Sequence, residues 1–151
     1  MRNTHVWPKP WWYRLAERLI PSRCREIPEA QDPDRILLRQ VAIWKQHAYL
    51  QQFASGEDPR WMHSHPWRYC VAIGLWGGYT EWRLTGPKRR RQAPYFFILD
   101  NRDIHNTTFP SRGHTSIFIG LGAKTDSKHY FYAFPVKIHW TKHIKRMVKR
   151  L

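Results

Sequence analysis

The sequence predicts an all-β fold, an antiparallel barrel or sandwich, with one short helix near each end of the chain. Its 151 residues suit a single domain with one core. Nine tryptophans and eleven prolines favour short strands and turns over long helices. Hydrophobic residues make up 42% of the chain and aromatic residues 15%, which is too apolar for a disordered protein.

The first region, residues 1–34, predicts a short helix followed by a connector. Within residues 11–20 the apolar side chains of Trp12, Leu15 and Leu19 recur at helical spacing, and a proline ends the pattern. The stretch 21–34 is rich in proline and polar residues, so we expect it to join the helix to the barrel.

Residues 35–136 carry the pattern of the barrel. Short β-prone runs alternate with clusters of Gly, Pro, Asn and Asp at roughly ten-residue intervals, as in antiparallel barrels. We expect strands at 35–44, 48–53, 68–76, 79–84, 95–99, 115–122 and 129–134.

The last region, residues 137–151, predicts a basic amphipathic helix. Ile144, Met147, Val148 and Leu151 share one helical face, and lysines and arginines occupy the rest. Such a helix either packs on its own domain or meets a nucleic acid or membrane surface.

Two histidines stand two residues apart in RWMHSHPW, just before an apolar run that leads to Gly77–Gly78, where we expect a tight turn. Residues two apart on a strand face the same side, so the imidazoles of His63 and His65 would aim at one point. A third ligand must come from a distant strand, and His105, after an apolar strand and a polar turn, is the best candidate. The alternative is a solvated edge with imidazoles on turn carbonyls. His114, in SRGHTS, is expected in a turn.

This order of elements resembles the cupin superfamily, and HSHPW…GGYTEW is similar to small bacterial and phage cupin-like proteins with a His-x-His-Pro-Trp motif. The resemblance covers about residues 36–135. It implies a cupin-type barrel, also called a double-stranded β-helix or jelly roll. It also implies a divalent metal ion (Fe, Zn, Ni or Mn) held by His63, His65 and His105.

The chain departs from the cupin pattern at the family's glutamate, where Tyr69 and Cys70 stand. Glu81 could supply a late carboxylate as an additional ligand. Asp103, two residues before His105, could accept a hydrogen bond from that histidine. Three histidines alone would leave a coordination position open, as a catalytic metal site requires.

Aromatic residues surround the first histidine motif. Trp61 and Trp67 share the strand parity of the two histidines, and with Tyr69 and Cys70 they could wall a ligand pocket. The alternative places these tryptophans in the core. Cys70 lies in an apolar run and is expected as a buried thiol.

The net charge of +15, from 26 basic and 11 acidic residues, would attract anions such as nucleic acid, anionic lipid or a phosphorylated substrate. Lys88, Arg89, Arg90 and Arg91 form a consecutive run in the stretch between the two motifs. This run is either a solvated loop, an anion clamp at the barrel mouth or a nucleic-acid contact.

Three functions stay open at this point. The first is a metal-binding cupin-like protein, which could itself be an enzyme of the dioxygenase or isomerase type that acts on a small anionic substrate. The second is a non-enzymatic basic module that binds nucleic acid through Lys88–Arg91 and the C-terminal tail. The third is a metal-free cupin that binds a small metabolite. We expect a cytoplasmic protein without a transmembrane segment, and exposed strand edges would allow a homodimer.

Overall fold

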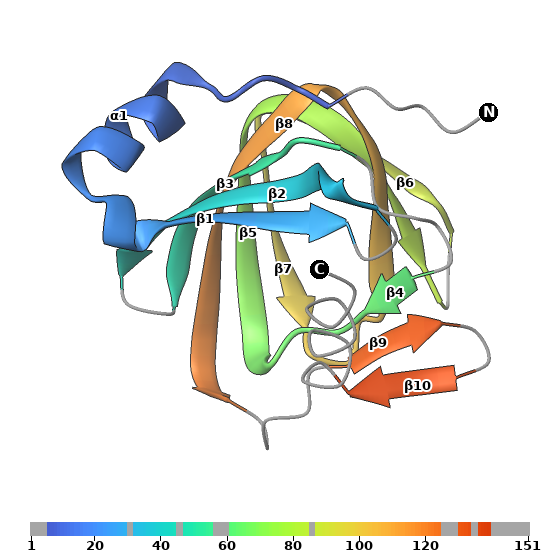
Figure 1. Cartoon of the computed structure of the whole chain (residues 1–151). Coiled ribbons are helices and arrows are strands. Elements are labelled where there is room, and N and C mark those ends of the chain that lie inside the picture. The colour runs from blue at the N-terminus through green and yellow to red at the C-terminus, as the bar shows by residue number, and fades with distance from the viewer. Residues whose placement is uncertain are drawn as a thin grey trace.

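Antiparallel strands make up most of the chain, and they form one curled sheet in the computed structural model (Figure 1). The structure describes residues 6–29, 32–44, 47–55, 61–84, 87–124, 130–133 and 136–139. Helix α1 (Trp11–Leu19) and a 3-10 turn (Pro21–Arg23) come first. The strands are β1 (Cys24–Glu29), β2 (Asp32–Trp44), β3 (Ala48–Phe53), β4 (Trp61–His63), β5 (Trp67–Arg83), β6 (Arg89–Gln92), β7 (Tyr95–Asp100), β8 (His105–Lys124), β9 (Tyr130–Ala133) and β10 (Val136–His139).

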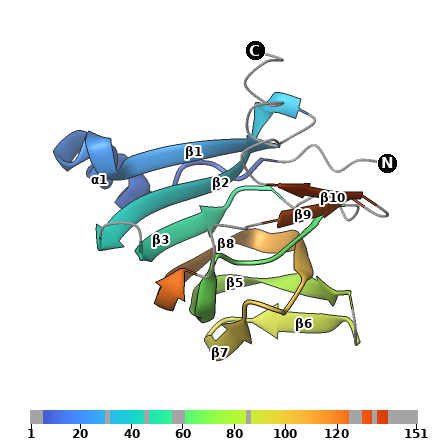
Figure 2. The same ribbon diagram turned by 90° about the horizontal axis from the view of Figure 1, so that it is seen from below.

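The two longest strands, β5 and β8, form the spine of the sheet. They pair antiparallel from Trp67 opposite Lys124 to Arg83 opposite His105. The other edge of β8 pairs with β3 and β4, and the other edge of β5 pairs with β6 and β7. Figure 2 shows β1, β2, β3, β8 and β5 following one another around the curl. The strand pairing confirms the predicted all-β antiparallel class and the barrel-like curl.

The Gly77–Gly78 pair lies inside β5, although the sequence predicted a turn there. Gly77 has a φ of 71°, and the β5–β8 register shifts on both sides of Gly78. A glycine with positive φ permits a β-bulge, which bends a strand without reversing it. The two strands predicted at 68–76 and 79–84 are therefore one long bent strand.

The stretch 21–34, predicted as a connector, contains β1 and the start of β2. These strands pair with Ile27 opposite Leu38, so the sheet begins before residue 35. Pro28 sits at a register shift of β1, which pairs with β2 alone in the described structure. An edge strand tolerates proline because one side needs no ladder hydrogen bonds, and this explains why a proline-rich stretch can be a strand.

The two predicted terminal helices have different outcomes. The N-terminal helix is present as α1, and its Tyr13 is 1% exposed. At the other end, residues 136–139 form β10, and the predicted helix residues 140–151 lie outside the described residues. Among the described helices, none has the length and apolar character needed to cross a membrane.

The apolar core lies where β3, β5, β7 and β8 face one another across the curl. Its buried members are Tyr49, Trp67, Cys70, Leu99 and Phe118. Cys70 and Leu99 are directly paired across β5 and β7, and Tyr49 and Phe118 are paired across β3 and β8. Because paired residues point to the same face of a sheet, these side chains meet on one side of the curl and support the strands that carry the histidines.

Candidate metal centre

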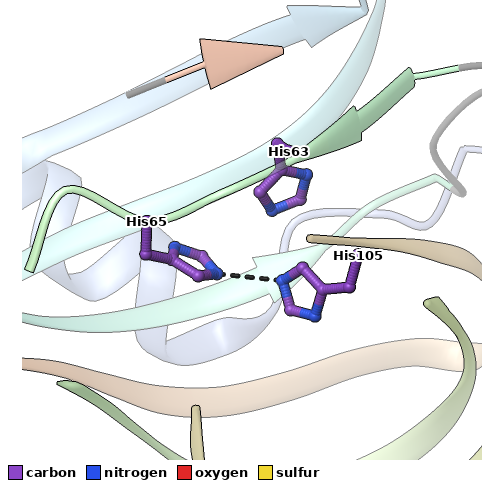
Figure 3. Close-up of side chains that lie close together, drawn as sticks. All are labelled: His63, His65 and His105. Carbon is purple, nitrogen blue, oxygen red and sulfur yellow. Dashed lines mark hydrogen bonds between the residues drawn. The ribbon is translucent and has the colours of Figure 1, made fainter. Parts of the chain in front are cut away.

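Three histidines from different segments meet at one end of the sheet. His63 is the last residue of β4, and His105, the first residue of β8, is its direct cross-strand partner. Paired residues present their side chains on the same face. His65 lies in the segment between β4 and β5, and its ring comes back toward the same point (Figure 3). One potential ligand atom from each of the three residues lies within 4.8 Å of the others.

The three imidazoles pack closely against one another. The ring centroid of His105 is 4.8 Å from that of His63 and 5.0 Å from that of His65, with interplanar angles of 65° and 80°. The Nε2 atoms of His65 and His105 are 2.9 Å apart. His105 is 3% exposed, and the other two histidines are half-buried. The centre is thus enclosed on the β8 side and more open on the β4 side.

The core supports one wall of this centre. The ring of His65 lies over Phe118, with centroids 4.9 Å apart. Phe118 also contacts Trp67, whose indole N–H donates to Nδ1 of His47 at 3.2 Å. His65 is therefore placed by packing on the core, although it lies outside a strand.

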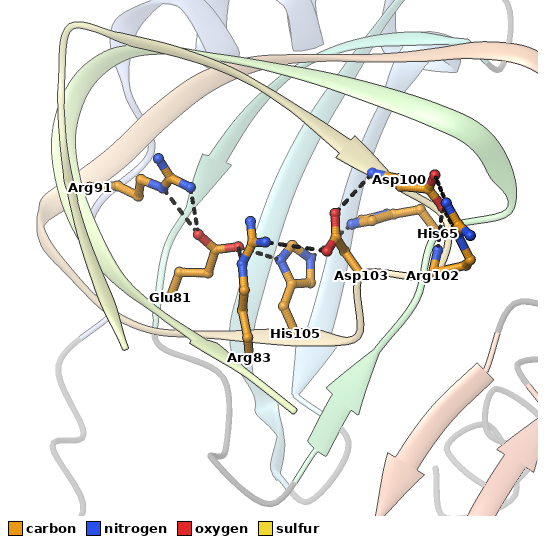
Figure 4. Close-up of polar contacts among 8 residues, drawn as sticks. All are labelled: His65, Glu81, Arg83, Arg91, Asp100, Arg102, Asp103 and His105. Atoms are coloured by element: carbon orange, nitrogen blue, oxygen red, sulfur yellow. Dashed lines mark hydrogen bonds and ion pairs between the residues drawn. The ribbon is translucent and has the colours of Figure 1, made fainter. Parts of the chain in front are cut away.

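Glu81 lies behind His105 and outside the group of converging nitrogens (Figure 4). Its Oε1 atom is 3.2 Å from Nδ1 of His105, and it also accepts from Nε of Arg83 at 3.0 Å. Its Oε2 atom accepts from Nε and Nη2 of Arg91 at 3.0 and 2.9 Å. Glu81, expected from the sequence as a possible additional ligand, has both oxygens engaged by other groups.

The pKa of Glu81 follows from these contacts. Burial alone would raise the pKa of the Glu81 carboxyl, which is fully buried. The hydrogen bond from His105, with the nearby guanidinium groups of Arg91 and Arg83, outweighs burial and lowers the pKa to about 2. Glu81 is thus an ionised carboxylate in the interior.

Asp103, expected to accept a hydrogen bond from His105, accepts from Arg83 and Asp100 instead. Its Oδ1 atom accepts from Nη1 of Arg83 at 3.2 Å, and its Oδ2 atom accepts from the backbone N–H of Asp100 at 2.9 Å. Glu81 takes the expected place because Arg83 is paired with His105 across β5 and β8, and Glu81 is two residues from Arg83 on the same face. The bulge at Gly77–Gly78 hides this parity in the sequence.

Of the four predicted pocket residues, the three whose side chains the structure describes do not share one wall. Trp67 and Cys70 belong to the buried core, and burial raises the pKa of the Cys70 thiol to about 12. Tyr69 is 39% exposed, with the guanidinium of Arg68 over its ring at 5.4 Å. The side chain of Trp61 lies outside the described residues.

The four consecutive cations are also separated. Arg89–Gln92 is strand β6, paired with β5, so most of the predicted loop is a strand. Lys88 lies over the ring of Trp82 at 4.3 Å, and Arg91 lies over Phe97 at 4.1 Å while it holds Glu81. Arg91 therefore binds an interior carboxylate, whereas Lys88, Arg89 and Arg90 are exposed.

His114 is a buried strand residue, although the sequence predicted it in a turn. It lies in β8 with 0% exposure, and its Nδ1 donates to the carbonyl oxygen of Trp76 at 3.0 Å. The hydroxyl of Tyr95 lies 2.7 Å from its Nε2 and donates to it. Burial lowers the pKa of His114 to about 4, so the ring is neutral. The flanking glycine and serine, typical of turns, hid this interior position.

Comparisons with known proteins add little to this description. No protein-family model matches the sequence, and no curated protein matches it either. Solved structures with a similar chain path include that of KdgF from Halomonas sp., at 13% identity and a TM-score of 0.39. The match covers 57% of this chain and 82% of the KdgF chain. A likeness of this size does not establish a shared fold, so the architecture stands on the strand pairing itself.

Proposed function

We propose that the protein binds one divalent metal ion between His63, His65 and His105, and that this centre is its functional site. The observation that carries the proposal is the convergence of one nitrogen from each of three imidazoles, all within 4.8 Å of one another. The three residues come from two strands and an intervening segment, so their meeting is a product of the fold and not of sequence proximity alone.

The donor set fits such an ion. Two nitrogens bound to one ion at about 2.1 Å lie roughly 3.0–3.4 Å apart, depending on the bond angle. The 2.9 Å between the Nε2 atoms of His65 and His105 is close to this separation. Imidazole nitrogens suit Zn, Fe and Ni, and water or carboxylate ligands would favour Mn. Nδ1 of His105 meets a carboxylate, which is the usual outer partner of a ligating histidine.

Three protein ligands leave room in the coordination shell for water or a small ligand. When bound, a divalent ion supplies Lewis-acid chemistry to that ligand. A net charge of +15 on the chain favours an anion as this ligand. We extend the proposal to a metal-dependent reaction on a small anionic molecule.

Metal analysis of the purified protein tests the first part. We expect about one equivalent of a divalent ion, or calorimetric binding of added Zn²⁺, Ni²⁺ or Mn²⁺ by the metal-free protein. The double variant His63→Ala, His65→Ala should lose this binding. His47→Gln is the matched control, since His47 lies outside the centre and glutamine keeps an acceptor for the Trp67 indole. Unchanged metal binding in the double variant would refute the proposal.

A further inference from the structure

We infer that Glu81 is a positioning residue for the metal centre: it holds the Nδ1–H tautomer of His105, so that Nε2 is the nitrogen presented to the ion. The inference rests on the proposed function and extends it to a residue outside the ligand set. The converging group contains the three histidines, and Glu81 lies beyond His105 from its centre.

The first step is the contact itself. Oε1 of Glu81 lies 3.2 Å from Nδ1 of His105, and the two side chains are 0% and 4% exposed. Both oxygens of Glu81 already accept from arginine guanidinium groups, as a carboxylate does, so the proton of this hydrogen bond belongs to Nδ1. A neutral imidazole carries one N–H, which leaves Nε2 of His105 as an acceptor facing His65.

The second step is what holds Glu81 in place. Arg91 reaches Oε2 from β6 with two N–H groups, and Arg83 reaches Oε1 from β5. A fork of two N–H bonds from one guanidinium gives both strength and direction. The carboxylate therefore has few other orientations open to it, and its oxygen stays directed at His105.

Asp103 extends these contacts to the turn that precedes His105. Arg83 also donates to Oδ1 of Asp103, and Asp103 stands in the turn that leads into His105. The other oxygen of Asp103 accepts from the backbone of Asp100, across that same turn. One connected set of charged groups, Glu81, Arg83 and Asp103, thus restrains both the ring of His105 and the backbone that leads into it.

The consequence is chemical as well as geometric. A carboxylate on the outer nitrogen of a ligating histidine fixes its tautomer and raises the basicity of the ligating nitrogen. Loss of such a partner usually lowers metal affinity by about 10- to 100-fold. We expect an effect of this size when Glu81 no longer accepts from His105.

The test begins with the metal-free wild-type protein, labelled with ¹⁵N. Long-range ¹H–¹⁵N spectra report which ring nitrogen of each histidine carries a proton. We expect His105 to be protonated at Nδ1 and unprotonated at Nε2. A proton on Nε2 of His105 with Nδ1 bare would overturn the inference without any variant or metal.

Variants then connect the tautomer to the metal. Glu81→Gln offers one acceptor oxygen where the structure uses two, so it cannot satisfy both His105 and Arg91. We expect a mixed His105 tautomer and Zn²⁺ affinity lowered by about 10- to 100-fold. Glu81→Asp, which keeps the charge, should recover part of the affinity. Glu26→Gln is the matched control, because Glu26 pairs with Arg39 across β1 and β2, away from the three histidines, and should leave Zn²⁺ affinity unchanged.

The outcomes separate the two proposals. Wild-type Zn²⁺ affinity in a folded Glu81→Gln variant contradicts the positioning role while the metal site stands. A wild-type protein that binds no metal contradicts the proposed function, and the Nδ1–H tautomer would still support the hold of Glu81 on His105. If Glu81→Gln does not fold, the test uses the His105 tautomer in the wild type and the Zn²⁺ affinity of Glu81→Asp. A proton on Nε2 of His105, or an affinity of Glu81→Asp equal to that of the wild type, would then contradict the positioning role.

Discussion

His65 and His105 stand 40 residues apart in the sequence, and their Nε2 atoms lie 2.9 Å apart. Two ring nitrogens at this distance share a proton, since two lone pairs would repel each other. Because the N–H at Nδ1 of His105 is directed at Glu81, the shared proton belongs to His65. One hydrogen bond thus joins the rings of His65 and His105.

Metal affinity should depend on pH, because a second proton on an imidazole competes with the ion for the binding nitrogen. Ligating histidines must give up the proton at the nitrogen that binds, and the ordinary pKa of histidine is about 6.5. We expect Zn²⁺ affinity to fall progressively as the pH is lowered from about 8 to about 6. Calorimetric titrations across this range, in buffers with different heats of ionisation, would also measure the protons released. An affinity that stays constant over the range contradicts a three-histidine centre.

His114 should make the fold sensitive to acid. Its pKa is about 4 in the folded protein, below the ordinary value of 6.5, so the folded state binds fewer protons between these two values. The neutral His114 ring contributes up to roughly 3 kcal/mol to the free energy of unfolding. This contribution is complete above about pH 6.5 and is lost as the pH falls towards about 4. Urea unfolding of the wild type and of His114→Gln at several pH values measures this contribution, because the variant lacks the titrating imidazole. Parallel pH profiles for the two proteins would argue against it.

Arg91→Met should destabilise the fold through Glu81. The variant removes both N–H donors from the Oε2 atom of a fully buried carboxylate, while Arg83 and His105 remain. A buried acceptor left without its partner costs about 1–3 kcal/mol. Arg90→Met is the control, because Arg90 is exposed on the same strand and should change stability by less than about 0.5 kcal/mol. Equal unfolding midpoints for the two variants would show that the pairing of Arg91 with Glu81 is not stabilising.

Gly120→Ala should disturb the core beneath the centre. A Cβ atom at Gly120 would overlap the indole of Trp67, which is 8% exposed and packs on Phe118. Forcing extra volume into a packed core costs about 1–3 kcal/mol. Thermal unfolding should show this loss, and Leu121→Ala, at a neighbouring residue that is 43% exposed, should have a smaller effect. A larger loss of thermal stability in Leu121→Ala than in Gly120→Ala would contradict the packing of Trp67 on Gly120.

The two cysteines should differ in reactivity. Cys70 is 0% exposed and burial raises its pKa to about 12, so the thiolate that reacts with disulfide reagents is scarce. Cys24 is half-buried near the surface. We expect one thiol to react in the native protein and both after unfolding. In Cys24→Ser, the native protein should not react, and rapid labelling of that variant would mean that the core opens readily.

Local patterns predicted a good part of the fold. The runs at 48–53 and 95–99 coincide with β3 and β7, because β-prone residues bounded by turn formers specify a strand locally. Spacing indicated His63 and His65, and the place of His105 after a strand and a turn made it the candidate third ligand; the structure brings the three together. The predictions of a connector at 21–34 and of a turn at Gly77–Gly78 were wrong, because proline also occurs in edge strands and glycine also occurs at bulges.

By itself, the sequence determined the antiparallel β class and which histidines stand next to strand-forming runs, since both depend on residues close in the chain. Only the tertiary structure decided the partners of those residues. The pairing of Arg83 with His105 across β5 and β8 places Glu81 behind the ring of His105, and the curl of the sheet buries His114. Register after a bulge and burial on one face of a curl depend on strands far apart in the chain, which local patterns do not record.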